Sequence, residues 1–238
     1  MGSAIKAILF DSGRVLNCPV TGHWFISPNF FNFVNEEKFK SLDLKIRNNA
    51  FHKANSYISK QNLIKDEDEE FYHFTEFYRI FSTELPQLKW DDNLIKSIAF
   101  DLVTNYKKYR FYKDASDLIP ELSRSYRLAV VSDAWPSLDN VFKQAGLRDY
   151  FSSFIISSTK GVTKPHELMY KTALEELEVS PSEAIFVDDN IRNCDGAEKL
   201  GVNSIVLCRD IRQYLFNKIT SPRHSIVRNL NDVIKKLR

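Results

Sequence analysis

An apolar run that ends at a carboxylate constrains the fold of this chain more than any other stretch. Residues 7–10 read Ala-Ile-Leu-Phe without polar alternation, and Asp11 follows them directly. A strand of this kind is typical of a parallel sheet that helices cover on both faces. Ligands of such sheets bind at the carboxyl ends of the strands, so the run predicts a reactive Asp11 at that edge. Gly13, two residues later, allows the backbone to turn close to a ligand or an ion.

Length and composition predict a soluble globular protein. The 238 residues are 43% hydrophobic, which is enough to bury a core, either as one large domain or as a core with an insertion. No apolar run approaches the roughly 18 residues that a membrane span needs, and Met1-Gly2-Ser3 leads into a strand rather than a signal peptide. We therefore expect a cytoplasmic protein without a membrane partner, as a monomer or a homodimer.

Charge and cysteine usage exclude further classes. The 33 basic and 31 acidic residues leave a net charge of +2, which gives no general attraction for nucleic acid, and the basic tail at residues 235–238 is too short to change this. The three cysteines, Cys18, Cys194 and Cys208, are odd in number and lack the paired spacing of metal sites. We interpret them as reduced thiols.

The segment after the first strand is predicted to be helical. No glycine occurs between Gly22 and Gly146, and prolines are few. Apolar residues at spacings of three and four predict one helix over residues 35–59, a second that begins near Asp66 and a third that begins near Asp91. The aromatic stripes on these helices are interpreted as the core of a small helical bundle, with a binding surface as the alternative.

From about Phe111 onward, the pattern changes to helices alternating with short apolar strands, which is typical of a parallel sheet. Gly146 and Gly201 are placed to end helices. Predicted helices cover residues 115–125, 137–145, 166–178 and 191–200, with Leu168, Ala173, Leu174 and Leu177 facing inward from the third. Predicted strands cover residues 127–131, 154–156, 184–187 and 204–207.

Polar groups suited to phosphoryl chemistry follow several of these strands. Asp11 ends the first strand, Ser132 follows the second, and a loop after the third carries Lys164. The pair Asp188-Asp189 follows the fourth. Because the carboxyl ends of parallel strands meet at one edge, we expect these side chains to converge there.

These residues also carry a resemblance to the haloacid dehalogenase superfamily of hydrolases. The matching motifs are Phe10-Asp11-Ser12-Gly13, Val130-Val131-Ser132-Asp133, Thr163-Lys164-Pro165-His166 and Phe186-Val187-Asp188-Asp189-Asn190 with Asn193, in that order. The resemblance implies an α/β fold, with a Rossmann-like, doubly wound parallel sheet as core and an inserted all-helical cap. The core would comprise residues 1–17 and 111–238, and the cap residues 18–110.

The resemblance also implies roles for the site residues. Asp11 would attack phosphorus and become an aspartyl-phosphate, while Lys164 and Ser132 contact the phosphate. Mg²⁺ prefers oxygen ligands, and Asp11, the Gly13 carbonyl, Asp188 and Asp189 make a plausible set. Substrate binding is assigned to Ser132, Asp133, Lys164, Arg14 and His23.

One departure from the family pattern leaves the activity open. Phosphatases of this superfamily usually carry a second Asp two residues after the nucleophile, as general acid and base, and Gly13 stands there in this chain. Some members resembling glucose-1-phosphate phosphatases share this arrangement, and the dehalogenase branch also lacks the second Asp. His23, in the loop Thr21–Phe25 that enters the cap, is the candidate for a substitute acid.

Three functions are therefore weighed. The first is a Mg²⁺-dependent phosphatase of a small phosphorylated metabolite, which the cap and the loop Thr21–Phe25 select. The second is a catalytically weakened binding or regulatory protein that keeps the metal and phosphate site. The third, a metal-independent dehalogenase, is disfavoured because Asp188 and Asp189 would repel each other beside the nucleophile without a cation.

Overall fold

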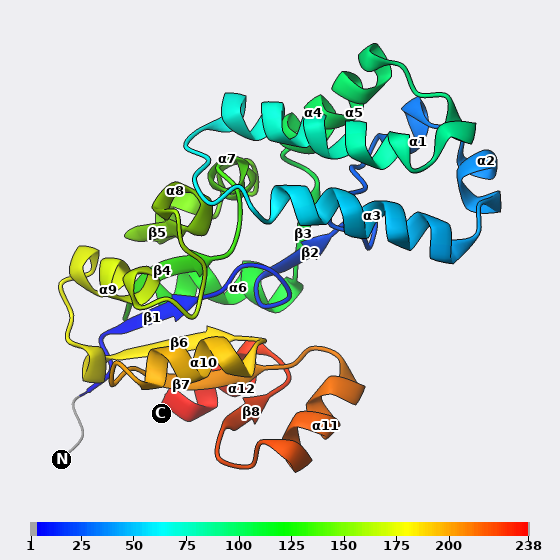
Figure 1. Ribbon diagram of the computed structural model, residues 1–238. Helices are drawn as coiled ribbons and strands as arrows, with labels where there is room; N and C mark the ends of the chain where they lie inside the picture. Colours follow the sequence, from blue (N-terminus) through cyan, green and yellow to red (C-terminus); the bar gives the residue numbers. More distant parts are fainter. Residues whose placement is uncertain (1–3, 238) are drawn as a thin grey trace.

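The computed structural model describes residues 4–237. Its core is built around a six-stranded parallel sheet (Figure 1). Residues 1–3, where no signal peptide is expected, and Arg238 of the basic tail lie outside the described residues. The six strands of this sheet lie side by side in the order β5 (Ser153–Ile156), β4 (Arg127–Ser132), β1 (Ala7–Phe10), β6 (Ala184–Asp188), β7 (Asn203–Leu207) and β8 (Ser225–Val227). This order confirms the predicted α/β fold with a doubly wound sheet.

Strand β1 shows why its sequence lacks polar alternation. Ile8 and Phe10 pack toward one face of the sheet, against α6 (Lys113–Leu122), α7 (Ser137–Gln144) and α12 (Leu230–Leu237). Ala7 and Leu9 pack toward the other, against α9 (Glu167–Glu176) and α10 (Ile191–Glu198). All four side chains are fully buried, and burial of each large one contributes roughly 1.5–3 kcal/mol. Helices cover both faces, as Figure 1 shows.

The predicted strands and helices of the core are found with small differences at their ends, and one orientation was wrong. Leu168 was expected to face inward but is 41% exposed, because it lies on the first turn of α9, away from the sheet. Ala173, Leu174 and Leu177 are buried as expected. The core also contains elements that were not predicted: β8, α11 (Ile211–Thr220), α12, the short helix α8 (Ser157–Lys160) and the 3₁₀ turns Arg148–Tyr150 and Pro181–Glu183.

The segment between β1 and β4 is helical, as predicted, but begins differently. The single helix expected over residues 35–59 was wrong. The chain forms α2 (Glu36–Ser41) and α3 (Leu44–Ile58), because Leu42 is extended and Asp43 accepts a hydrogen bond from the backbone N–H of Lys45 at 2.6 Å, which starts a new helix. A short helix, α1 (Phe30–Phe33), precedes them.

Two longer helices complete this bundle and confirm the predicted starts. Asp66 caps α4 (Glu67–Thr83), and Asp91 caps α5 (Asp92–Thr104), which follows a 3₁₀ turn at Pro86–Leu88. The aromatic side chains form the bundle's own apolar core, as interpreted from the sequence. Its fully or nearly fully buried aromatic members are Phe30, Phe39, Phe74, Phe77, Tyr78 and Phe81.

Two short antiparallel strands join the helical bundle to the sheet. These are β2 (Asn17–Pro19) and β3 (Tyr109–Phe111), so the chain leaves the sheet and returns to it side by side. The predicted boundaries at residues 17/18 and 110/111 fall within this pair. We call helices α1–α5 the cap; that it is a separate domain stays a prediction.

A buried polar contact also fixes the cap on the sheet domain. Glu70, on α4 of the cap, accepts hydrogen bonds from the backbone N–H of Ser137 at 2.8 Å and from its hydroxyl at 2.7 Å. Lys108 donates to the same hydroxyl at 2.7 Å, and its Nζ lies 3.9 Å from the Glu70 carboxylate. No side chain of α7 itself caps the N-terminus of this helix. Glu70 of the cap bundle supplies a carboxylate there instead.

Across residues 4–237, none of the helices combines the length and the apolar character that crossing a membrane would require.

Candidate active site

The register of the sheet brings Asp11 beside Asp188. Phe10 pairs with Val130 on one side and Val187 on the other, and the backbone N–H of Asp11 donates to the carbonyl of Val187 at 2.9 Å. From this centre the chain winds outward through β4 and β5 on one side and through β6, β7 and β8 on the other. Such a switch point is where doubly wound sheets bind ligands.

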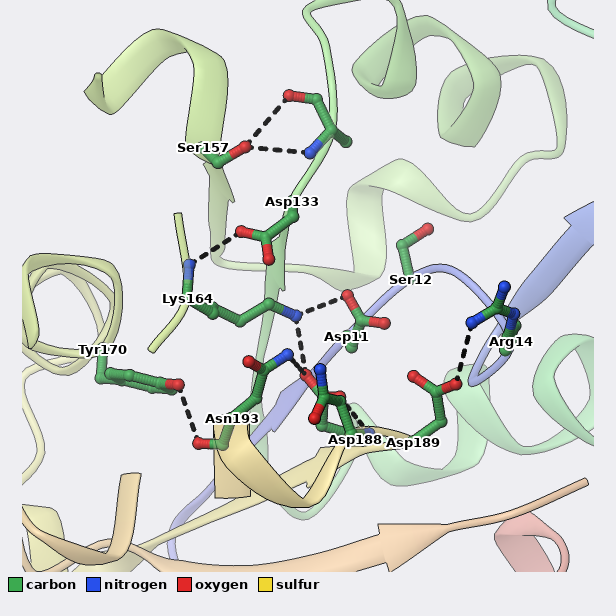
Figure 2. Close-up of polar contacts among 12 residues, drawn as sticks. Asp11, Ser12, Arg14, Asp133, Ser157, Lys164, Tyr170, Asp188, Asp189 and Asn193 are labelled. Carbon is green, nitrogen blue, oxygen red and sulfur yellow. Dashed lines mark hydrogen bonds and ion pairs between the residues drawn. The ribbon is translucent and has the colours of Figure 1, made fainter. Parts of the chain in front are cut away.

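Lys164 joins the two carboxylates. Its Nζ lies 2.6 Å from Oδ1 of Asp11 and 2.8 Å from Oδ2 of Asp188, as Figure 2 shows, and its side chain is 1% exposed. The backbone N–H of Lys164 donates to Oδ1 of Asp133 at 2.9 Å, which fixes the loop that carries it. Burial alone would lower the pKa of Lys164, but the negative charges of Asp11, Asp188 and Asp133 raise it above its ordinary value.

Asp188 is fully buried and held by two further donors. The side chain of Asn193 donates to Oδ2 at 3.0 Å, and the backbone N–H of Asn190 donates to Oδ1 at 2.7 Å. Tyr170 in turn donates its hydroxyl to the carbonyl of Asn193 at 2.8 Å (Figure 2). This network fixes the carboxylate in one orientation.

Three carboxylates form an acidic cluster at this edge. One oxygen each of Asp11, Asp188 and Asp189 can be chosen so that all lie within 4.8 Å of one another. Burial raises the pKa of Asp11 to about 7, with Lys164 opposing the rise and Asp188 adding to it. Burial and the charge of Asp188 also raise the pKa of Asp189, which lies 3.6 Å from Arg14. Like charges this close gain from a cation, and the oxygen donors fit Mg²⁺.

The loop after Asp11 is fixed by its own hydrogen bonds. Asn17 donates from its side chain to the hydroxyl of Ser12 at 2.7 Å, and the backbone N–H of Arg14 donates to the carbonyl of Asn17 at 2.7 Å. Arg14 has a positive φ of 61°, which closes this tight turn. The turn places the guanidinium of Arg14 3.6 Å from the carboxylate of Asp189.

A cavity of about 310 Å³ opens above these residues. Its polar lining comes from the strand ends and their loops: Asp11, Ser12, Gly13, Arg14, Asn17, Ser132, Asp133, Lys164, Asp189, Asn190 and Asn193. Its other lining is mainly aromatic and comprises Trp24, Phe25, Tyr109, Ala134, Trp135 and Leu138. We call the first set the polar floor and the second the aromatic wall. The volume suits a small molecule.

The structure brings together all but one of the predicted site residues. Asp188 lies directly below the cavity, bonded to Lys164, and the remaining residues line it. His23 does not line it: its ring packs 4.4 Å from the ring of Phe51, and its Nδ1 accepts a hydrogen bond from the backbone N–H of Phe25 at 3.2 Å. Burial lowers the pKa of His23. His23 lies outside the cavity lining, whereas its neighbour Trp24 is part of it, and a role of His23 in the site stays a prediction.

Sequence reasoning missed several lining residues. Trp135 comes two residues after the strand end at Ser132 and Asp133, so its position in the sequence could have predicted that it lines the cavity. Asn190 and Asn193 were part of a matching motif, but no site role was assigned to them. Tyr109 and Asn17 gave no such signal, because they reach the cavity only through the pairing of β2 with β3.

Comparisons with known proteins identify the family of this chain. A family model described as haloacid dehalogenase-like hydrolase matches residues 32–207. An (S)-2-haloacid dehalogenase from Xanthobacter autotrophicus is 29% identical over 126 residues, 53% of this chain and 50% of that protein. A phosphoserine phosphatase from Thermus thermophilus is 28% identical over 137 residues, 56% and 55% of the two chains. The chain thus matches about half the length of these curated relatives.

Solved structures show the same fold over nearly the whole chain. A magnesium-bound hydrolase from Bacillus subtilis superposes with a TM-score of 0.67 at 14% identity and covers 99% of this chain and 100% of its own. The Xanthobacter autotrophicus dehalogenase with covalently bound chloropropionic acid gives a TM-score of 0.62 at 19% identity and covers 96% of both chains.

Proposed function

This chain belongs to the haloacid dehalogenase-like hydrolases, and from this membership and the geometry of its cavity we propose that it is a Mg²⁺-dependent phosphatase of a small phosphorylated metabolite. The observation that carries the proposal is the cluster of Asp11, Asp188 and Asp189 within 4.8 Å. Among the described residues that line the cavity or contact this cluster, Lys164 is the only buried cation. A divalent ion would balance the remaining charge and let an anionic phosphate approach Asp11.

Three residues of the polar floor have direct roles in this reaction. Bound Mg²⁺ would neutralise charge on the phosphate oxygens. A carboxylate oxygen of Asp11 forms a bond to phosphorus while the bond to the leaving oxygen breaks, which gives an aspartyl-phosphate. Lys164, already 2.6 Å from Asp11, neutralises charge there, and Ser132 donates a hydrogen bond to a phosphate oxygen. Water then hydrolyses the intermediate and restores the carboxylate.

A dehalogenase is the second candidate, because (S)-2-haloacid dehalogenases are among the relatives at similar identity to the phosphatases. In that reaction Asp11 would attack carbon and displace halide without a metal. The acidic cluster favours the phosphatase, since Asp189 beside the nucleophile would repel the carboxylate of a haloacid.

A substrate screen with and without Mg²⁺ separates these functions. We expect phosphate release from phosphorylated metabolites that needs Mg²⁺ and stops in excess chelator, and no halide release from 2-chloropropionate. Halide release that persists in chelator would support the dehalogenase. Phosphate binding without turnover would support a weakened binding or regulatory protein instead. A cytoplasmic location and the lack of nucleic-acid partners stay predictions.

A further inference from the structure

Trp24 occupies the space beside the nucleophile loop that a side chain at position 13 would need. A Cβ on Gly13 would lie 3.1 Å from Cη2 and 3.4 Å from Cζ2 of this indole. Any larger side chain would have to displace the ring. The cavity is therefore bounded at this point by an apolar ring and a bare backbone.

The aromatic wall is held in place by packing against its neighbours. Trp24 packs edge-on to Tyr109, with ring centroids 5.1 Å apart. Trp135 packs 4.9 Å from Phe74 and 6.1 Å from Phe25, and both contacts join it to the apolar core of the cap. The carbonyl of Phe25 accepts the hydroxyl hydrogen of the fully buried Tyr78 at 2.8 Å. A flat apolar group can thus bind without reorganising the wall.

The wall also lacks a well-placed proton donor. Among the carboxylates of the floor, Asp11 contacts Lys164, Asp189 contacts Arg14, and Oδ1 of Asp133 accepts the backbone N–H of Lys164, which leaves Asp133 as the floor's remaining candidate acid. Tyr109 is the wall's titratable residue, and burial raises its pKa above the ordinary value, so it is a poor acid near neutral pH.

We propose that the substrate is the phosphate ester of a planar, apolar alcohol whose oxygen leaves as a stabilised anion, with phenols as the simplest class. The proposal rests on the phosphatase activity proposed above. A carboxylate oxygen of Asp11 bonds to phosphorus as the aryl oxygen departs with its electron pair, and the phenolate then takes a proton from water. Because a phenolate spreads its charge over the ring, it departs without an acid. A cavity of about 310 Å³ admits one ring and a phosphate.

Three esters of similar size test the two parts of this inference. Phenyl and benzyl phosphate both present a flat ring but differ in leaving group, whereas benzyl and cyclohexylmethyl phosphate share an alkoxide leaving group and differ in flatness. With Mg²⁺ present, we measure the ratio of kcat/KM for phenyl phosphate to kcat/KM for benzyl phosphate. We expect this ratio to be about 10²- to 10⁴-fold larger than in a phosphatase that carries a positioned acid. Benzyl should exceed cyclohexylmethyl phosphate by about 3- to 10-fold.

Variants of the wall separate its role from general stability. Trp24→Ala should remove the preference for benzyl over cyclohexylmethyl phosphate, Trp24→Phe should restore most of it, and Trp90→Phe, in the cap core away from the cavity, should leave it unchanged. Circular dichroism of each variant checks folding.

Equal kcat/KM for phenyl and benzyl phosphate would overturn the inference and make Asp133 the first acid to examine, while the phosphatase proposal would stand. A preference for benzyl phosphate that survives Trp24→Ala would overturn the role of the wall. Failure to hydrolyse any phosphate ester with Mg²⁺ would overturn the phosphatase proposal, and this inference with it.

Discussion

The polar floor and the aromatic wall face the same cavity but depend on different physics. In the floor, Asp11 and Lys164 are buried charges, and with Asp188 just below they form a site in which two carboxylates share one buried cation. In the wall, Trp24 and Trp135 contribute apolar contacts shared among many neighbours. Losing one of these charges should therefore cost far more activity than losing one ring, and losing the single cation should also cost stability.

Replacing Asp11 should have the largest effect on activity. Asp11→Asn keeps the size of the side chain but removes the attacking charge, so turnover should fall by at least about 10⁴-fold. Steady-state phosphate release and trapping of the phosphorylated enzyme measure this loss. A variant that retained more than a trace of activity would rule out the covalent reaction through Asp11.

The same variant should be more stable than the parent at neutral pH without metal. The pKa of Asp11 rises from 3.8 to about 7 on folding, so the folded state binds this proton more tightly than the unfolded state. The free energy of unfolding should therefore fall as pH rises through that window, and Asp11→Asn should lack this fall. Urea unfolding in excess chelator at about pH 5 and about pH 8 tests the sign, and parallel pH profiles for the two proteins would contradict it.

Replacing Lys164 should damage both activity and stability. Lys164→Met leaves Asp11 and Asp188 buried without their shared cation, which should cost about 3–5 kcal/mol of stability. The rate should fall by about 10²- to 10³-fold. Lys171→Met, an exposed lysine paired with Glu167 on α9, is the matched control and should change stability by about 1 kcal/mol or less.

Magnesium sharpens this comparison, because an ion at the acidic cluster replaces part of the lost positive charge. We expect saturating Mg²⁺ to raise the melting temperature of Lys164→Met more than that of the parent protein. Equal shifts in both proteins would show that the ion binds away from these carboxylates.

The polar groups of the floor were predictable from sequence, whereas of the wall only the loop Thr21–Phe25, with Trp24 and Phe25, was expected beside the substrate. A carboxylate directly after a buried strand, as at Asp11 and Asp188, can be placed by the geometry of parallel strands alone. Tyr109 reaches the cavity through the pairing of β2 with β3, and its contact with Trp24 joins residues far apart in the chain. Short-range periodicity carries no information on such contacts.

The cap shows the same limit on a smaller scale. Helix starts at Asp66 and Asp91 were readable because capping is local. The break at Leu42-Asp43 was missed because the apolar spacing continues across it. The contact of Glu70 with Ser137 joins residues 67 positions apart, so sequence gave no sign that it stabilises the junction.

The contact between Glu70 and Ser137 should contribute less to stability than the charges of the floor and more than one ring of the wall. Glu70→Ala removes the acceptor of two hydrogen bonds from Ser137 and takes away the carboxylate 3.9 Å from the buried Nζ of Lys108, so stability should fall by about 3 kcal/mol. Glu70→Gln keeps one acceptor and should cost about half as much. Denaturant unfolding measures both, and an unchanged midpoint for Glu70→Ala would show that the junction contributes little.

The smallest effect on activity should come from His23, the residue that sequence reasoning placed in the site. Its ring packs on Phe51 and accepts a hydrogen bond from the backbone of Phe25, away from the cavity lining. His23→Ala should therefore lower stability by about 1–2 kcal/mol and leave kcat/KM within about threefold of the parent value. Burial lowers the pKa of His23 below 6.5, so the unfolded state binds this proton more tightly and the parent should lose stability as pH falls below that value. The variant should lack this loss, whereas disappearance of the acid-dependent limb of the rate profile in His23→Ala would return the histidine to the catalytic site.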